Sequence, residues 1–217
     1  MFIGHLATGL AAKKLETRPS LATYLASASL PDLLFTALLW AGVESVQVEP
    51  GYTAVTPLRF PFYPYSHSLL AALLLSAAVF LGYWWLRRSV RAATIVGVLP
   101  LGHWLLDVVS HRPDVPIGLS GPVVGLGLWQ SIAGTFAVEG ALFAAGVYLY
   151  QRATRPRDRV GRWAFVAFVV FLLLVYVPGP FGPPPPSVTA VAAVNSSLLL
   201  LLLWAGWFDR HRESRAS

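Results

Sequence analysis

Two long apolar stretches separated by a short basic turn decide the fold of this chain. Residues 67–111 read HSLLAALLLSAAVFLGYWWLRRSVRAATIVGVLPLGHWLLDVVSH. Each half offers about 20 residues, and at a rise of about 1.5 Å per residue such a helix crosses a hydrocarbon core of about 30 Å. The apolar residues run on without alternating with period two, which argues against transmembrane strands. The stretch therefore predicts two transmembrane helices, over 67–86 and 91–111.

Four further segments have the same apolar character and length, namely 20–42, 125–150, 162–179 and 187–208. Only 12% of the 217 residues are charged, whereas an average soluble domain has about 25%. This composition excludes an ordinary cytosolic enzyme, a disordered regulator and a nucleic-acid-binding domain. We therefore expect an all-α fold, a polytopic membrane helical bundle of about six transmembrane helices that forms a single domain over residues 1–217.

Residues 2–14 are apolar but too short to span a bilayer. One interpretation is an amphipathic helix that lies on the inner leaflet. The other is a half-length helix inserted among the spans, which would carry His5 to about mid-depth. The sequence leaves both interpretations open.

The basic residues predict the orientation of the bundle. Of the 16 Lys and Arg residues, 14 fall on one side of the expected spans, and only Arg59 and Arg112 fall on the other. The positive-inside rule makes the richer side cytoplasmic, with both termini inside. The net charge of +6 is then mostly a topology signal with some attraction to anionic lipid. We expect a multi-pass protein of the plasma (inner) membrane, with membrane lipid as partner and no nucleic acid.

Several ionisable residues fall inside the expected spans, where each costs at least about 2.5–3.5 kcal/mol. They are Asp32, His67, His103, Asp107, His111 and Glu139. Residues at i, i+4 and i+8 share one stripe of a helix, so the three members of the third span should face the same way. No basic residue of the spans neutralises the carboxylates, and a divalent cation would. Imidazole and carboxylate ligands suit Zn, with Mn or Fe as alternatives; an internal hydrogen-bonded network or proton path is the other interpretation.

Depth along the helices places Glu139 near the middle of the bundle and the site as a whole in its outer half. His103, Asp107 and His111 approach the outer end of the third span, and His67 enters from that same end. Ligands of a shared metal lie about 2 Å from the ion. We therefore expect the side chains of Asp32, His67, His103 and Asp107 to converge within about 5 Å. The chain has no cysteine, so thiolate ligands and thiol nucleophiles are excluded.

These polar residues belong to sequence motifs, which are Gly4-His5-x-Ala7-x-Gly9, Pro31-Asp32-Leu-Leu, Pro64-Tyr-Ser-His-Ser-Leu-Leu70 and His103-Trp-Leu-Leu-Asp107-x-x-x-His111-Arg-Pro-Asp114. In these motifs the chain resembles the bacterial membrane-bound metal-dependent hydrolase-like family over about residues 1–150. Leu34 stands where relatives often carry a second Asp, and Phe62-Tyr63 stand where they carry His-Arg. The resemblance is therefore to a divergent branch of that family.

The order of these residues is also similar to the ligand order of the helical zinc-dependent phospholipase C and nuclease P1 class. The resemblance implies metal ligands at His5, Asp32, His67, His103, Asp107 and His111, with Glu139 as a further ligand or general base. Thr135 stands where that class has its last His, which favours one or two metal ions over three.

The function that these observations suggest is a metal-dependent hydrolase that acts at the outer membrane surface. A phosphoester of a lipid or lipid-linked molecule is the expected substrate. Asp32 and Glu139 are the expected catalytic groups, because a carboxylate can orient or deprotonate the attacking water. Two alternatives remain: a small transporter or ion pathway that uses the same residues, and a non-catalytic membrane protein with a structural metal.

Overall fold

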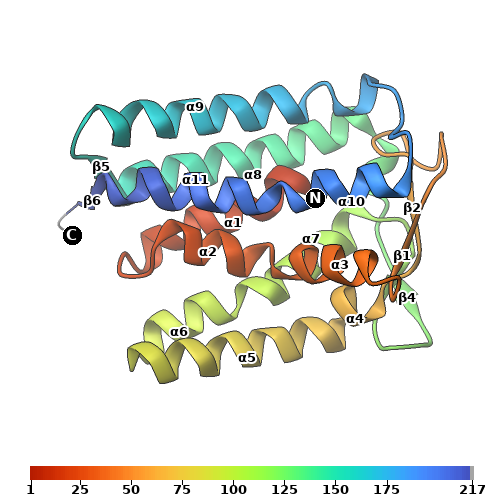
Figure 1. Cartoon of the computed structure of the whole chain (residues 1–217), viewed down its shortest axis with the longest axis horizontal. Coiled ribbons are helices and arrows are strands. Elements are labelled where there is room, and N and C mark those ends of the chain that lie inside the picture. Colours follow the sequence, from red (N-terminus) through yellow and green to blue (C-terminus); the bar gives the residue numbers. More distant parts are fainter. Residues whose placement is uncertain (216–217) are drawn as a thin grey trace.

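The structure is a computed structural model that describes residues 1–215 of the single unit expected over 1–217, and it confirms the all-α class (Figure 1). The α-helices are α1 Phe2–Leu15, α2 Leu21–Ala28, α3 Leu30–Trp40, α4 Pro64–His67, α5 Leu69–Arg87, α6 Val90–Gly97, α7 Leu99–Ser110, α8 Ile132–Ala153, α9 Arg159–Tyr176, α10 Val188–Ser196 and α11 Leu198–Arg210. Two single 3-10 turns, Leu128–Gln130 and Gly179–Phe181, lie in the connections.

Three short antiparallel ribbons join the helix ends, a feature that the apolar runs did not predict. Their strands are β1 Ser45–Val48, β2 Leu58–Phe62, β3 Val115–Pro116, β4 Val123–Val124, β5 Thr154–Pro156 and β6 Arg212–Ser214. β1 pairs with β2, β3 with β4, and β5 with β6. The first two ribbons lie in the connections at one end of the bundle, and the third lies at the opposite end (Figure 1).

Five helical units are long and apolar enough to cross a membrane: α5, α6 with α7, α8, α9 with the following turn, and α10 with α11. α2 and α3 make a sixth if they count as one span, and they are bent by 59°. Pro31 and Pro100 stand in the first turn of α3 and α7, where a residue without an N–H is tolerated at a helix start but not inside a helix. The fourth span begins at Ile132, so residues 125–131, which we expected within it, form a loop and a 3-10 turn.

Serine and aspartate side chains define where several helices begin. Ser68 accepts a hydrogen bond from the backbone N–H of Ala71 at the start of α5. Ser131 at α8, Asp158 at α9 and Ser187 at α10 each accept the equivalent bond from the residue three positions on. These bonds satisfy backbone donors that the first helical turn leaves free, which explains why the apolar runs become helical at these points.

α1 lies inside the bundle and packs along α8, which excludes the interpretation that places it on the inner leaflet surface. Ile3, Leu6 and Leu10 are at most 1% exposed. At Gly146 of α8, an added Cβ would stand 2.6 Å from the carbonyl oxygen of Ala7. Small residues at such contacts let two helix backbones approach closely within a membrane, and this approach carries His5 into the centre of the molecule.

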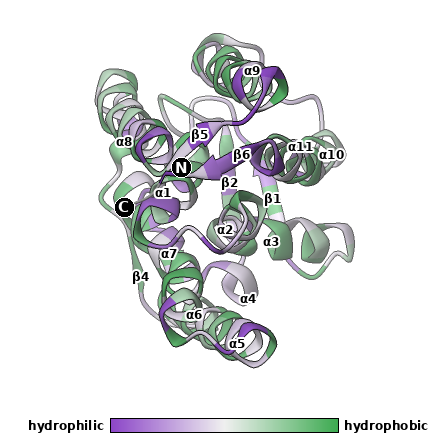
Figure 2. Cartoon of the chain, turned by 90° about the vertical axis from the view of Figure 1, so that its left-hand side faces the viewer, coloured by the Kyte–Doolittle hydropathy of each residue, from purple (hydrophilic) through white to green (hydrophobic). Residues whose placement is uncertain are grey.

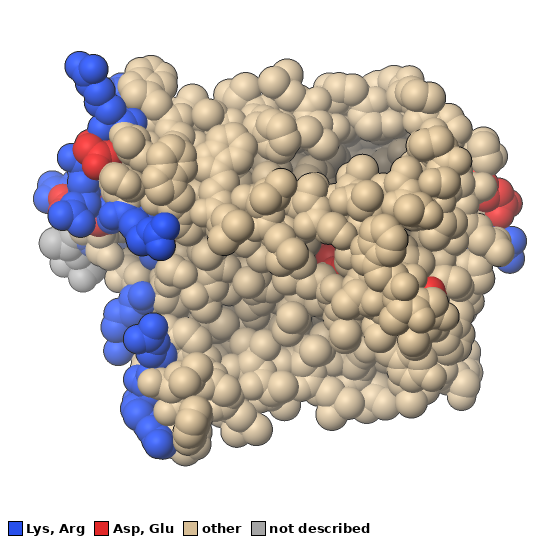
Figure 3. All heavy atoms as spheres, viewed as in Figure 1, with Lys and Arg blue, Asp and Glu red and all other residues tan. Residues whose placement is uncertain are grey.

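The outer surface of the bundle is that of a multi-pass membrane protein. Leu174, Leu200 and Leu203 are 66–70% exposed, and large apolar side chains of this kind cover the flanks of the helices. Lys and Arg side chains gather at one end, while most of the face in view carries no charge (Figure 3). Seen from that basic end, hydrophilic residues lie in the connections around the helix ends (Figure 2). The apolar sides therefore suit contact with lipid.

Candidate metal centre

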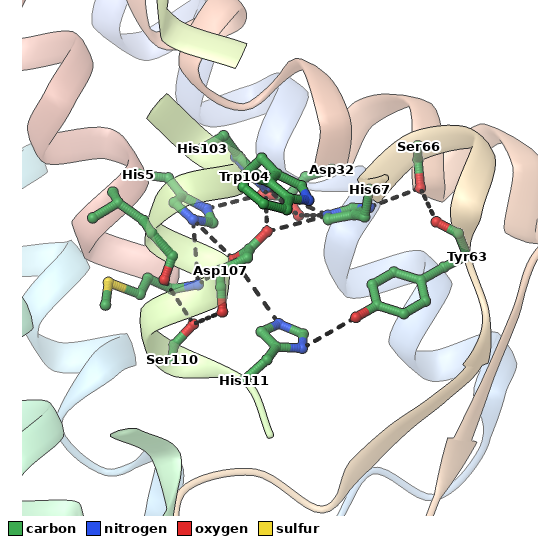
Figure 4. A network of polar contacts seen from close by, with 12 residues as sticks. His5, Asp32, Tyr63, Ser66, His67, His103, Trp104, Asp107, Ser110 and His111 are labelled. Carbon is green, nitrogen blue, oxygen red and sulfur yellow. Dashed lines mark hydrogen bonds and ion pairs between the residues drawn. The ribbon is translucent and has the colours of Figure 1, made fainter. Parts of the chain in front are cut away.

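Five ionisable residues from four helices meet inside the bundle (Figure 4). They are His5 of α1, Asp32 in the first turn of α3, His67 at the end of α4, and His103 and Asp107 one turn apart on α7. The short helix α4, which begins at Pro64, brings His67 toward α7. The bend between α2 and α3 brings Asp32 toward the same helix. We call these five residues the His/Asp cluster.

The ring atom Nε2 of His103 lies at the centre of the cluster. It is 3.1 Å from Asp107 Oδ2, 3.4 Å from His67 Nε2 and 3.8 Å from Asp32 Oδ1. His67 Nε2 also lies 3.5 Å from Asp32 Oδ1 and 3.8 Å from Asp107 Oδ2. The structure thus brings together the four side chains that the sequence analysis expected to converge.

His5 joins the cluster from the opposite side of His103. The two rings are 3.5 Å apart between centroids and are tilted by 31°. His5 Nε2 is 3.1 Å from Asp107 Oδ1, and its Nδ1 is 3.7 Å from Asp32 Oδ2. The amino group of Met1 also lies 3.1 Å from Asp107 Oδ1, so one oxygen of this carboxylate faces two nitrogen atoms.

Two of the histidines are held so that Nε2 points into the cluster. The Nδ1 atom of His103 lies 2.8 Å from the carbonyl oxygen of Ala28, which only accepts, so this nitrogen donates and, in the neutral imidazole, Nε2 keeps its lone pair. The Nδ1 atom of His67 lies 2.7 Å from Ser66 Oγ. Such contacts on the second ring nitrogen fix the orientation and tautomer of metal-binding histidines.

A buried carboxylate extends the support of His67. Glu44 is 2% exposed and accepts a 2.5 Å bond from the Ser66 hydroxyl and backbone bonds from Tyr65 and Ser66 at 2.7 and 3.0 Å. Because the single hydroxyl proton goes to the carboxylate, Ser66 Oγ accepts from His67 Nδ1. Glu44 is not among the residues predicted for the site, since it lies in a long connection between helices. The available signal is that a serine precedes the candidate ligand His67 and that Glu44 is one of two acids in the connection leading to it.

His111 sits at the edge of the cluster. α7 ends at Ser110, and His111 has extended backbone angles as its cap residue, so it does not continue the helical stripe that we expected. Its Nε2 is 3.9 Å from Asp107 Oδ1, and its Nδ1 is 3.0 Å from Asp114 Oδ1. Tyr63, whose hydroxyl donates to the same carboxylate at 3.2 Å, is buried, and burial followed by the nearby Asp114 raises the pKa of its hydroxyl well above its usual range. Tyr63 therefore remains a donor at neutral pH.

Glu139 does not make contact with the His/Asp cluster. It is 1% exposed, and its Oε2 accepts a 3.3 Å bond from the backbone N–H of Gly4. Thr135 lies one turn earlier on α8 and is also buried, with its hydroxyl donating to the carbonyl of Leu128. The structure therefore leaves α8 out of the group of side chains that meet around His103.

The residues of the cluster fit a divalent metal ion. Candidate ligand atoms of His5, His103 and Asp107, and of Asp32, His67 and His103, lie within 4.8 Å of one another in each group. Among the described residues 1–215, His5 Nδ1 and Asp107 Oδ2 are buried and find no hydrogen-bond partner, although such atoms are normally satisfied inside proteins. Imidazole and carboxylate groups bind zinc, and they also bind other transition metals. The buried His/Asp groups can therefore hold a metal ion.

No protein-family model, curated protein or solved structure matches this chain. Its function is therefore argued from the site itself.

Proposed function

We propose that this protein is a membrane-embedded hydrolase that depends on a divalent metal, most simply Zn²⁺, and cleaves a phosphoester of a lipid or lipid-linked molecule. The observation that carries the proposal is the convergence of His67, His103 and Asp107 with His5 and Asp32 inside a transmembrane bundle. Ionisable side chains within membrane spans cost free energy of insertion, and where they occur they usually mark a functional site.

The five side chains would hold the ion, and His103 belongs to both groups of candidate ligands. A metal bound there would supply Lewis-acid stabilisation of the anionic transition state and make a water molecule more acidic. Asp32 has the most exposed side chain of the cluster, at 38%, whereas the others are at most 7% exposed. In this proposal its carboxylate accepts a hydrogen bond from the attacking water and takes its proton as the new P–O bond forms. The ester P–O bond breaks in the same reaction, and the proton passes from Asp32 to the alkoxide oxygen that leaves as the alcohol.

The position of the cluster supports a substrate at the outer membrane surface. The basic end of the bundle (Figure 3) would face the cytoplasm by the positive-inside rule. His67, His103 and Asp107 lie toward the other end, near the beginning of α5 and the end of α7. Lipid substrates would explain why the active residues are set among membrane spans.

The first experiment measures metal in the purified protein by elemental analysis. We expect stoichiometric transition metal in the natural sequence and its loss in His103→Ala and Asp107→Ala. His211→Ala is the matched control, since His211 lies outside the cluster and pairs with Asp158 at 2.6 Å. Well-folded protein that takes up no metal on incubation with Zn²⁺ would exclude the proposal.

The second experiment measures release of phosphate or alcohol from phosphoesters, including phospholipids in mixed micelles. Turnover that requires metal and is lost in His103→Ala, but kept in His211→Ala, supports a hydrolase. Metal binding without turnover on any phosphoester would leave a structural metal site as the better account.

One observation favours a transporter as the second candidate. α2 and α3 form a span bent by 59°, and Asp32 lies just after the break. Broken helices are typical of substrate and ion sites in transporters, and acidic residues within spans often mark ion pathways. Metal-ion flux into liposomes without phosphoester turnover would favour this function over hydrolysis.

A further inference from the structure

A pocket of about 540 Å³ opens beside the His/Asp cluster, and nothing in the proposed chemistry uses it. Its walls come from residues 50, 51, 53–58 and 60 of the long connection, from Trp129, from the end of α9 and from the proline-rich residues 179, 180 and 182–185. The face drawn in Figure 3 is hollowed toward the end that these connections occupy. The volume lies in the range of about 300–1,000 Å³ that small-molecule sites have.

The lining of the pocket suits an uncharged, apolar ligand. Phe2, Leu58, Phe60, Trp129, Val175 and several prolines supply most of it. Of the described residues that line it, none is Lys or Arg, and Glu139 is the only carboxylate. Glu139 is 1% exposed and bonded to Gly4 N, so the pocket offers almost no charged surface to a ligand. An anionic group bound there would lose its hydration without a partner.

Two aromatic side chains connect the pocket to the cluster. Trp129 and Phe60 line the pocket, and their rings lie 4.3 and 5.3 Å from the ring of His111. His111 Nε2 is in turn 3.9 Å from Asp107 Oδ1. The pocket is therefore separated from the candidate metal ligands by only a thin layer of side chains.

The pocket also borders the surface that faces lipid. Val175 lines it and is 48% exposed at the end of α9, whereas its neighbour Leu174 is 68% exposed and does not line it. A lipid next to α9 could therefore place part of itself in the pocket without crossing water.

We infer that the pocket binds a hydrocarbon chain of a membrane lipid, while the anionic end of the same lipid lies at the His/Asp cluster. This inference rests on the proposed function for the role of the cluster. The charges decide which end of the lipid binds where. The described residues give the pocket aromatic and aliphatic walls without Lys or Arg, so it suits the hydrocarbon chain. The cluster can hold a metal cation, so it suits the anionic end. Apolar burial then contributes affinity, and the metal site selects the reacting group.

The test uses the full chain in vesicles that contain phosphatidylglycerol with a photoactivatable diazirine in its acyl chain. Labelled positions are mapped by mass spectrometry after illumination. We expect labels concentrated at Phe60, Trp129 and residues 179–185. The inference would be overturned if the labels spread along the exposed leucines of the helices and none lay in the pocket. This outcome can be read from the natural sequence alone.

Variants sharpen the result. Val175→Trp places an indole in the pocket and should abolish labelling of Trp129, whereas Leu174→Trp adds the same bulk on the lipid side and should leave it unchanged. Ala54→Trp, from the loop side of the pocket, gives a second blocking variant if the first does not fold. Unchanged pocket labelling in a folded blocking variant would contradict the inference.

Asp107→Ala separates this inference from the proposed function. The variant should lose metal and turnover but keep the acyl-chain labels, because the pocket does not include Asp107. Pocket labelling in a protein that never hydrolyses phosphoesters would refute the hydrolase and leave the binding site standing. Turnover on lipids without pocket labelling would do the reverse.

Discussion

The hydroxyl of Ser66 should control how tightly the cluster binds metal, although it is not a ligand. It accepts from His67 Nδ1 at 2.7 Å and donates to the buried Glu44 at 2.5 Å. In Ser66→Ala the imidazole loses this support, and its ring and tautomer are no longer held with Nε2 toward His103. Glu44 keeps its two backbone donors, so the loop should stay folded.

The size of the effect follows from what such supporting contacts contribute elsewhere. Removing the partner of a ligating histidine costs about 10–100-fold in metal affinity, which is about 1.4–2.8 kcal/mol at about 1.4 kcal/mol per tenfold change. We expect Ser66→Ala to weaken Zn²⁺ binding by this factor. Glu44→Gln should have a smaller effect in the same direction, because an amide still accepts from the hydroxyl.

The assay is a competition titration of metal-free protein with Zn²⁺ and a chromophoric chelator. The visible spectrum of bound Co²⁺ is the second readout, since it reports the ligand geometry and not the stability of the fold. Ser110→Ala is the matched control: Ser110 is also fully buried beside the cluster, but its hydroxyl bonds only to the carbonyls of Leu106 and Asp107. Equal affinities of Ser66→Ala and Ser110→Ala would refute the reasoning.

Two further predictions concern the helix contacts that hold the cluster in place. Gly146→Ala should lower the free energy of unfolding in micelles by about 1–3 kcal/mol, because the new Cβ meets the carbonyl of Ala7. Gly140→Ala on the same helix has open space for its Cβ and should leave this free energy unchanged. Equal losses in the two variants would contradict the close contact at Gly146. Asp209→Asn should lower it by about 3–5 kcal/mol, because Lys13, 3.0 Å away and 6% exposed, keeps its bond to the carbonyl of Pro19 but loses the opposite charge. Adding Lys13→Met to that variant should recover part of the loss, measured as the same unfolding free energy, and no recovery would contradict the pairing.

The helical character of the chain and the positions of most spans could be predicted from local patterns alone. Continuous apolar runs set the length of α5 and α9, and prolines at 31 and 100 stand where α3 and α7 begin. The i, i+4 spacing of His103 and Asp107 places both on one face of any helix, and the structure keeps them 3.1 Å apart. These features depend on neighbours in the sequence, so backbone geometry is enough to decide them.

The three-dimensional arrangement alone decided which of the polar residues meet. His67 reaches His103 across 36 positions, Glu44 supports it from a connection, and Glu139 bonds instead to the backbone of Gly4. The sequence also left open whether α1 lies on the membrane or among the spans. In lipid, a face that packs against protein is as apolar as a face that contacts hydrocarbon, so hydropathy does not tell them apart. The contact of Gly146 with Ala7 makes that choice, and with it the place of His5 in the cluster.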